Sequence, residues 1–87
     1  MAVAWCVYMV RCGDGSLYTG IATEAARRVA EHNDNDLLAA KYTRTRRPVV
    51  LVYQERCIDR ADAARREHAI KRMRRREKLS LIDGLTV

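Results

Sequence analysis

The chain has 87 residues, enough to bury one hydrophobic core but too few for a second domain, so we expect a single domain over residues 1–87. Hydrophobic residues make up 48% and charged residues 32% of the chain, which excludes a disordered protein. Seventeen Lys and Arg against eleven Asp and Glu give a net charge of +6, an excess that either a polyanionic partner or solubility alone explains equally well.

The first apolar run spans residues 3–10 and is rich in β-branched and aromatic side chains, which predicts a central strand covered on both faces. It meets Arg11 too early to form a signal peptide or a membrane span, so we expect a cytoplasmic protein with no membrane partner. Residues 12–16 have turn chemistry, and residues 17–22 resume a strand. The pair predicts a β-hairpin.

Helical spacing begins at Thr23, a candidate N-cap, with Glu24 expected in the first turn of a helix that runs to about Asn33. The segment 37–47 has no clean period and predicts a basic loop. Behind Pro48, residues 49–55 have strong β propensity and predict a third strand.

The C-terminal third predicts two more helices. Asp59 is an N-cap candidate for a helix over residues 60–73, and a shorter helix over residues 75–82 ends before Gly84, a residue typical of helix termini. The predicted element order is β-β-α-β-α-α.

The three cysteines lack the CxxC spacing of metal sites and lie in or beside apolar runs, so we expect buried free thiols at Cys6, Cys12 and Cys57. The sequence has no Gly-rich phosphate loop, no HExxH motif and no Cys/His quartet. We therefore expect neither a nucleotide cofactor nor zinc.

Two tyrosines lie on the two strands of the predicted hairpin. A turn centred near residues 13–15 makes Tyr8 and Tyr18 approximate cross-strand neighbours. Gly20 points to the same face as Tyr18 and would leave a gap where the backbone of a ligand can approach. From strand geometry alone, aromatic packing with Gly20 as a kink is the simpler interpretation.

The first predicted helix carries Arg27 and Arg28, and His32 follows Arg28 at i+4, so these two share a helical face. A guanidinium beside an imidazole can bind phosphate and move a proton, although a solvated surface explains them equally well. Glu67 is an acid in a basic stretch: it either pairs with Lys71 at i+4 or provides one ligand to a divalent cation such as Mg²⁺.

Two basic segments flank these residues. The first, residues 41–47, mixes cations with hydroxyls and one aromatic ring that could stack on a base. The second has eight Lys and Arg between residues 65 and 78. We expect them to contact the nucleic-acid backbone rather than to recognise bases. The residues expected at this surface are Lys41, Tyr42, Arg44, Arg46, Arg47, Arg65 and Lys71.

Together these motifs resemble the GIY-YIG nuclease superfamily, in its small stand-alone bacterial UPF0213 branch. Residues 6–8 stand at the first triad of that family and residues 18–20 at the second, while residues 26–33 look like its "ERRLxEHN" helix. Residues 41–43 and Glu67 fall at its loop motif and acidic metal ligand. Cys6 replaces the first glycine of the triad, a position that looks structural.

The resemblance implies an α+β fold, a three-stranded antiparallel sheet flanked by helices, and metal-dependent hydrolysis of DNA phosphodiester bonds. It implies Tyr8 as general base beside Tyr18, although the sequence leaves open which tyrosine acts. A free tyrosine has a pKa near 10, so a cation must lower it for base catalysis at neutral pH.

By the same resemblance, Arg28 would stabilise charge on the phosphoryl group, His32 would orient a tyrosine hydroxyl or the phosphate, and Glu67 would hold one Mg²⁺ or Mn²⁺ ion. We expect a DNA partner, with branched or damaged DNA and a repair role as options. A homodimer or a protein partner stays open. The alternative function is a non-catalytic nucleic-acid-binding module with the same fold.

Overall fold

The computed structural model describes residues 4–84, an α+β fold around a three-stranded antiparallel sheet. The strands are β1 (Trp5–Arg11), β2 (Leu17–Ala22) and β3 (Val50–Cys57), in the order β2-β1-β3. The predicted fold class, hairpin and central strand are confirmed, and of the predicted first strand only Val3 lies outside the described residues.

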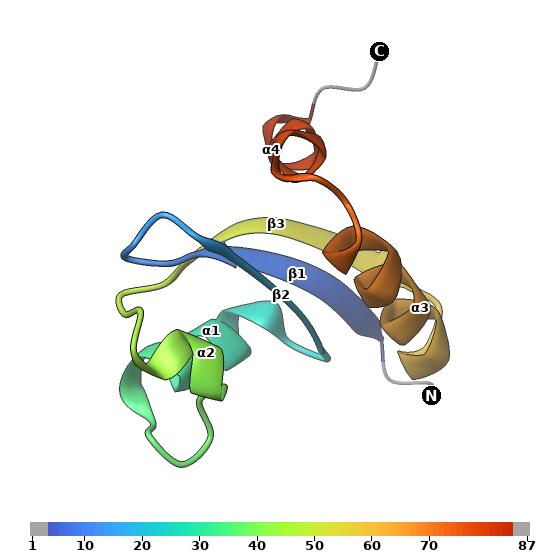
Figure 1. Ribbon diagram of the computed structural model, residues 1–87. Helices are drawn as coiled ribbons and strands as arrows, with labels where there is room; N and C mark the ends of the chain where they lie inside the picture. Colours follow the sequence, from blue (N-terminus) through green and yellow to red (C-terminus); the bar gives the residue numbers. More distant parts are fainter. Residues whose placement is uncertain (1–3, 85–87) are drawn as a thin grey trace.

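Residues 4–84 form four helices around this sheet. They are α1 (Ala25–Asp34), α2 (Lys41–Arg44), α3 (Arg60–Lys71) and α4 (Arg75–Asp83). Figure 1 shows α1 and α2 on one side of the sheet and α3 and α4 on the other. The middle strand is therefore covered on both faces, as its apolar run predicts.

The strand β1 supplies alternate side chains to two separate cores, because successive residues of a strand point to opposite faces. Tyr8 and Val10 pack on the α1 side, whereas Val7 and Met9 pack on the α3 side together with Ile70. All five of these side chains are almost completely buried. The core on the α1 side contains Tyr8, a residue of the candidate site.

The structure differs from the sequence-based predictions at several element ends. Glu24, not Thr23, occupies the N-cap of α1, and its side chain makes no capping hydrogen bond there. Asp59 does cap α3, accepting the N–H of Asp62 at 2.8 Å, and Gly84 ends α4 in the left-handed conformation. The strand β3 continues two residues beyond the expected end, and α3 stops at Lys71.

The segment 37–47 is not entirely a loop, because residues 41–44 form the single turn α2. The carbonyl of Ala40 accepts the N–H groups of Thr43 and Arg44, and also the Thr43 hydroxyl at 2.9 Å. A turn of four residues is too short to show a helical period, so the sequence pattern could not reveal it.

The hairpin loop docks on the end of this segment. The N–H of Gly13 donates to the Arg46 carbonyl at 2.7 Å, and a Cβ at Gly13 would lie 2.8 Å from the Arg47 carbonyl oxygen. Only glycine permits this approach. The contact ties residues 46–47 to the β1–β2 hairpin and so helps to position α2 beside the sheet.

The three cysteines are buried and free, as predicted. Within residues 4–84, no helix has the length and apolar character needed to cross a membrane.

Candidate functional site

The Tyr8 side chain lies across the glycine of the neighbouring strand. In the β1–β2 ladder Tyr8 pairs with Gly20 and Tyr18 pairs with Val10, so the two tyrosines are diagonal neighbours on one face. A Cβ at Gly20 would lie 2.6 Å from Tyr8 Oη and 2.8 Å from the ring carbon that bears it. The gap predicted for a ligand backbone is therefore filled by Tyr8, and that interpretation of Gly20 was wrong.

His32 meets the hydroxyl of Tyr8 inside the protein. Its Nε2 lies 2.8 Å from Tyr8 Oη, and the imidazole is completely buried. On the other side of the ring, Nδ1 accepts the N–H of Ala40 at 3.1 Å and lies 3.1 Å from Thr43 Oγ1. His32 of α1 thus contacts Tyr8 through Nε2, and its Nδ1 contacts the N-cap residue Ala40 and Thr43 of α2.

Burial controls the charge of both groups. It lowers the pKa of His32 to about 4, with the Arg28 and Arg47 cations acting in the same direction against Glu31. It also raises the pKa of Tyr8 well above its ordinary value, helped by Tyr18 and opposed by Arg28. At neutral pH the pair is therefore a neutral imidazole and a neutral phenol.

Tyr18 belongs to a column of rings beside this pair. Its ring makes a T-shaped contact with the His32 ring, with centroids 5.5 Å apart, and stacks on the Tyr42 ring, with centroids 5.7 Å apart. The Arg46 guanidinium lies 3.8 Å from the centroid of the Tyr42 ring. Tyr42, expected only at the nucleic-acid surface, is thus also a packing partner of Tyr18.

Of the two adjacent arginines of α1, Arg28 is the one beside the tyrosine. Its charge counters part of the rise in the pKa of Tyr8 and lowers that of His32. Its guanidinium donates to the Leu38 carbonyl at 2.6 Å and to Glu31 at 3.0 Å, which holds it in place. The Arg27 side chain is 64% exposed and pairs with Glu24.

Glu67 lies on α3 and its carboxylate pairs with Lys71 at 3.3 Å, the i+4 contact that its spacing predicts. The side chain is 23% exposed, and its negative charge contributes to the raised pKa of Tyr8, so it lies within electrostatic reach of that hydroxyl. No group of three or more His, Cys, Asp or Glu residues that could hold a metal occurs between residues 4 and 84. Any ion held by Glu67 would keep most of its waters, which suits Mg²⁺.

Several cations expected to bind nucleic acid have acidic partners. Arg46 pairs with Asp14, Arg65 pairs with Asp62, and Lys71 pairs with Glu67. Arg47 is a structural residue: it donates to the His32 carbonyl at 2.7 Å and to Asp36 at 2.7 Å, and its Nη2 is buried without a partner.

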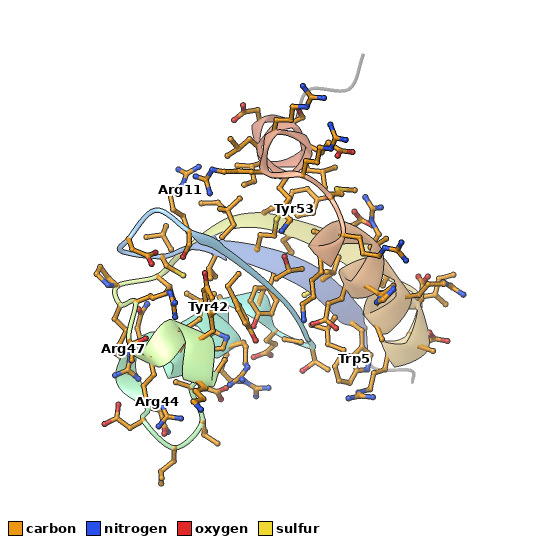
Figure 2. The ribbon with its side chains drawn as sticks, viewed as in Figure 1. Trp5, Arg11, Tyr42, Arg44, Arg47 and Tyr53 are labelled. Carbon is orange, nitrogen blue, oxygen red and sulfur yellow. The ribbon has the colours of Figure 1, made fainter. Side chains whose placement is uncertain are left out.

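The cations without an acidic partner among the described residues lie elsewhere. Lys41 and Arg44 are exposed on α2, and Arg11 lies at the hairpin end, near α4 (Figure 2). Most of the others surround the start of α4, where the Arg75 guanidinium reaches the Gly15 carbonyl at 3.0 Å. That group comprises Arg72, Arg74, Arg75, Arg76 and Lys78, and we call it the α4 cations. The sequence shows this charge run but not its lack of partners.

The comparisons with known proteins identify the family of the chain. The protein-family model of the GIY-YIG catalytic domain matches residues 4–80 of this chain. A UPF0213 protein of Desulfotalea psychrophila is 54% identical over 93% of this chain and 73% of its own, and one of Staphylococcus haemolyticus is 52% identical over 88% and 92%.

Two solution structures have a similar fold. The UPF0213 protein BH0048 of Bacillus halodurans matches with a TM-score of 0.57 and 38% identity, over 92% of this chain and 83% of its own. The protein EF2693 of E. faecalis matches with a TM-score of 0.61 and 35% identity, over 93% and 84%. The chain therefore belongs to the GIY-YIG nuclease superfamily, in its UPF0213 family.

Proposed function

We propose that the protein is a divalent-metal-dependent DNA endonuclease that hydrolyses phosphodiester bonds. The observation that carries the proposal is the buried 2.8 Å contact between Tyr8 Oη and His32 Nε2, with Arg28 within electrostatic reach of both rings. A module that only binds nucleic acid needs surface cations, but it has no use for a histidine buried against a phenol. This arrangement favours chemistry at the tyrosine.

In this proposal Tyr8 is the general base that deprotonates the attacking water. Burial raises the pKa of Tyr8, so the protein alone keeps the hydroxyl protonated and positive charge must offset the effect. Arg28 supplies part of that charge. Tyr18, whose ring packs against those of His32 and Tyr42, would have a supporting role.

Glu67 is the residue proposed to hold one Mg²⁺ or Mn²⁺ ion, because its partly exposed carboxylate lies within electrostatic reach of Tyr8. When bound, such an ion neutralises charge on the scissile phosphate and on the leaving oxygen. Arg28 would stabilise the charge that develops on the other phosphoryl oxygens, since its guanidinium is already fixed by two hydrogen bonds.

The substrate we propose is DNA, held through its phosphates by Lys41, Arg44 and the α4 cations. The domain described by residues 4–84 itself offers little surface on which to recognise a long sequence, so the proposal favours structured or damaged DNA and a repair role. It also includes a cytoplasmic location, where the three free thiols would stay reduced.

The test is incubation of the protein with branched, nicked and plain duplex DNA in the presence of Mg²⁺ or Mn²⁺. The wild type should cleave at least one substrate, and Tyr8→Phe and Arg28→Ala should each cleave it about 100-fold more slowly or worse, as expected when a general base or a charge-stabilising group is lost. The matched control is Arg27→Ala, which removes the same charge from the adjacent, exposed position and should keep activity.

Two outcomes would contradict the proposal. Cleavage that survives in Tyr8→Phe and Arg28→Ala at the wild-type rate would exclude this site. Salt-sensitive binding without cleavage by any variant, on every substrate and with both metals, would favour the non-catalytic nucleic-acid-binding module.

A further inference from the structure

We propose that the helix α2 fixes the proton of His32 on Nε2, so that His32 donates a hydrogen bond to the Tyr8 hydroxyl and cannot accept its proton. The position of the proton follows from the contacts of the imidazole alone. Its meaning for catalysis rests on the proposed nuclease function.

The backbone N–H of Ala40 determines the state of Nδ1. This group lies 3.1 Å from His32 Nδ1, and a backbone N–H can only donate. A proton on Nδ1 would point at the amide proton and leave this partly buried backbone donor without a partner, which is costly in free energy. Nδ1 therefore carries its lone pair.

The Thr43 hydroxyl does not determine which nitrogen of His32 carries the proton. Its Oγ1 lies 3.1 Å from His32 Nδ1 and 2.9 Å from the Ala40 carbonyl, so its hydroxyl proton can rotate to either acceptor. The hydroxyl oxygen could also accept from a protonated Nδ1, and Thr43 alone would permit either tautomer. The Ala40 amide, which can only donate, selects the tautomer with an unprotonated Nδ1.

The ring holds only one proton at neutral pH. His32 is completely buried, and burial together with the cations Arg28 and Arg47 keeps it neutral. With Nδ1 acting as an acceptor, the single proton is on Nε2, which lies 2.8 Å from Tyr8 Oη. The Tyr8 oxygen is then the acceptor, and its own proton is free for another partner.

The position of this proton decides between two roles for His32: proton acceptor in a relay, or hydrogen-bond donor to Tyr8. In a relay, His32 would take the Tyr8 proton while Tyr8 takes one from water, but the nitrogen that faces Tyr8 already carries a proton. Tyr8 must instead lose its proton to solvent before it acts, and its phenolate oxygen then takes the proton of the attacking water. His32 keeps its own proton throughout and stabilises the phenolate by a charge-assisted hydrogen bond.

The experiment measures the tautomer directly by long-range ¹H–¹⁵N NMR of protein labelled with ¹⁵N-histidine at neutral pH. The background variant is His68→Gln, which removes the only other histidine, from an exposed position on α3, and leaves His32 as the single imidazole in the spectrum. We expect Nε2 at the shift of a protonated nitrogen and Nδ1 at that of an unprotonated one. A protonated Nδ1, or two averaged shifts, would overturn the proposal.

A second variant tests the part played by α2. Ala40→Pro removes the amide that donates to Nδ1, and the Ala40 φ of −61° already suits proline. In this variant a population with the proton on Nδ1 should appear, because Thr43 Oγ1 can then accept it. An unchanged tautomer in folded Ala40→Pro would show that the amide does not set it, and if that variant fails to fold, the His68→Gln spectrum decides.

These measurements do not depend on nuclease activity. A protonated Nε2 in a protein that cleaves no DNA would support the proton position and contradict the proposed function. Cleavage by a protein with a protonated Nδ1 would do the reverse.

Discussion

The hydroxyl of Tyr8 lies directly over Gly20 on the neighbouring strand, where a Cβ would be 2.6 Å from the oxygen. Gly20→Ala must therefore displace the Tyr8 ring from His32. We expect it to lower the free energy of unfolding by about 1–3 kcal/mol, the usual cost of overpacking a core, as measured by urea denaturation. It should also reduce DNA cleavage, because the Tyr8–His32 contact is lost.

A double-mutant cycle separates this cause from any other effect of alanine at position 20. In a Tyr8→Leu background the ring is absent, so Gly20→Ala should cost at least about 1 kcal/mol less than in the wild type. An equal cost in both backgrounds would mean that the Tyr8 ring is not the obstacle.

Much of the fold could be predicted from the sequence because it depends on local patterns. The apolar run of β1, the turn residues of the hairpin and the caps Asp59 and Gly84 are each decided within a few residues, and the structure confirms them. The single turn α2 could not be predicted, since one turn has no period. It is held by contacts with His32 and with the hairpin at Gly13, neither of which is local.

The contacts of the candidate site could be predicted only in part. Hairpin spacing places Tyr8 near Tyr18, and only the family resemblance relates His32 to a tyrosine, whereas the pairing of Tyr8 with Gly20 needed the exact register of the ladder. The hydrogen bond from the Ala40 amide to His32 could not be predicted from the sequence, because every residue except proline has a backbone N–H. Ion pairs such as Arg46 with Asp14 join distant parts of the chain, so only the structure shows which cations have no acidic partner within residues 4–84.

Protonation of His32 should make the protein less stable as the pH falls. Burial lowers its pKa from an ordinary value of 6.5 to about 4, so between these values the unfolded chain binds a proton that the folded protein does not. The free energy of unfolding should therefore fall by roughly 1.4 kcal/mol for each pH unit in this window. Urea denaturation at a series of pH values measures the slope.

The control removes each histidine in turn. His32→Gln should lose this part of the slope, and His68→Gln should keep it, while the titration of carboxylates remains in both. If the two variants have the same pH dependence, His32 is not the group responsible.

Removal of the Glu67 carboxylate should change the metal requirement of cleavage. Glu67→Gln keeps the size of the side chain but weakens its affinity for a hard cation, so we expect cleavage to need at least about tenfold more Mg²⁺, or to be lost. A Mg²⁺ titration of the cleavage rate measures this. Glu24→Gln is the control, because it removes an equally charged group that pairs with Arg27 at the exposed start of α1. An unchanged titration in Glu67→Gln would remove Glu67 as the metal ligand.

The α4 cations should contribute more to DNA affinity than cations that already have acidic partners. Arg72→Ala/Arg76→Ala removes two exposed charges without an acidic partner in the described chain, and Arg27→Ala/Arg65→Ala removes two that pair with Glu24 and Asp62. Both variants change the net charge equally. Because each phosphate contact releases counterions, the first variant should flatten the plot of log affinity against log salt by about 2, and the second by clearly less. Equal slopes would mean that net charge, and not the surface at α4, attracts the DNA.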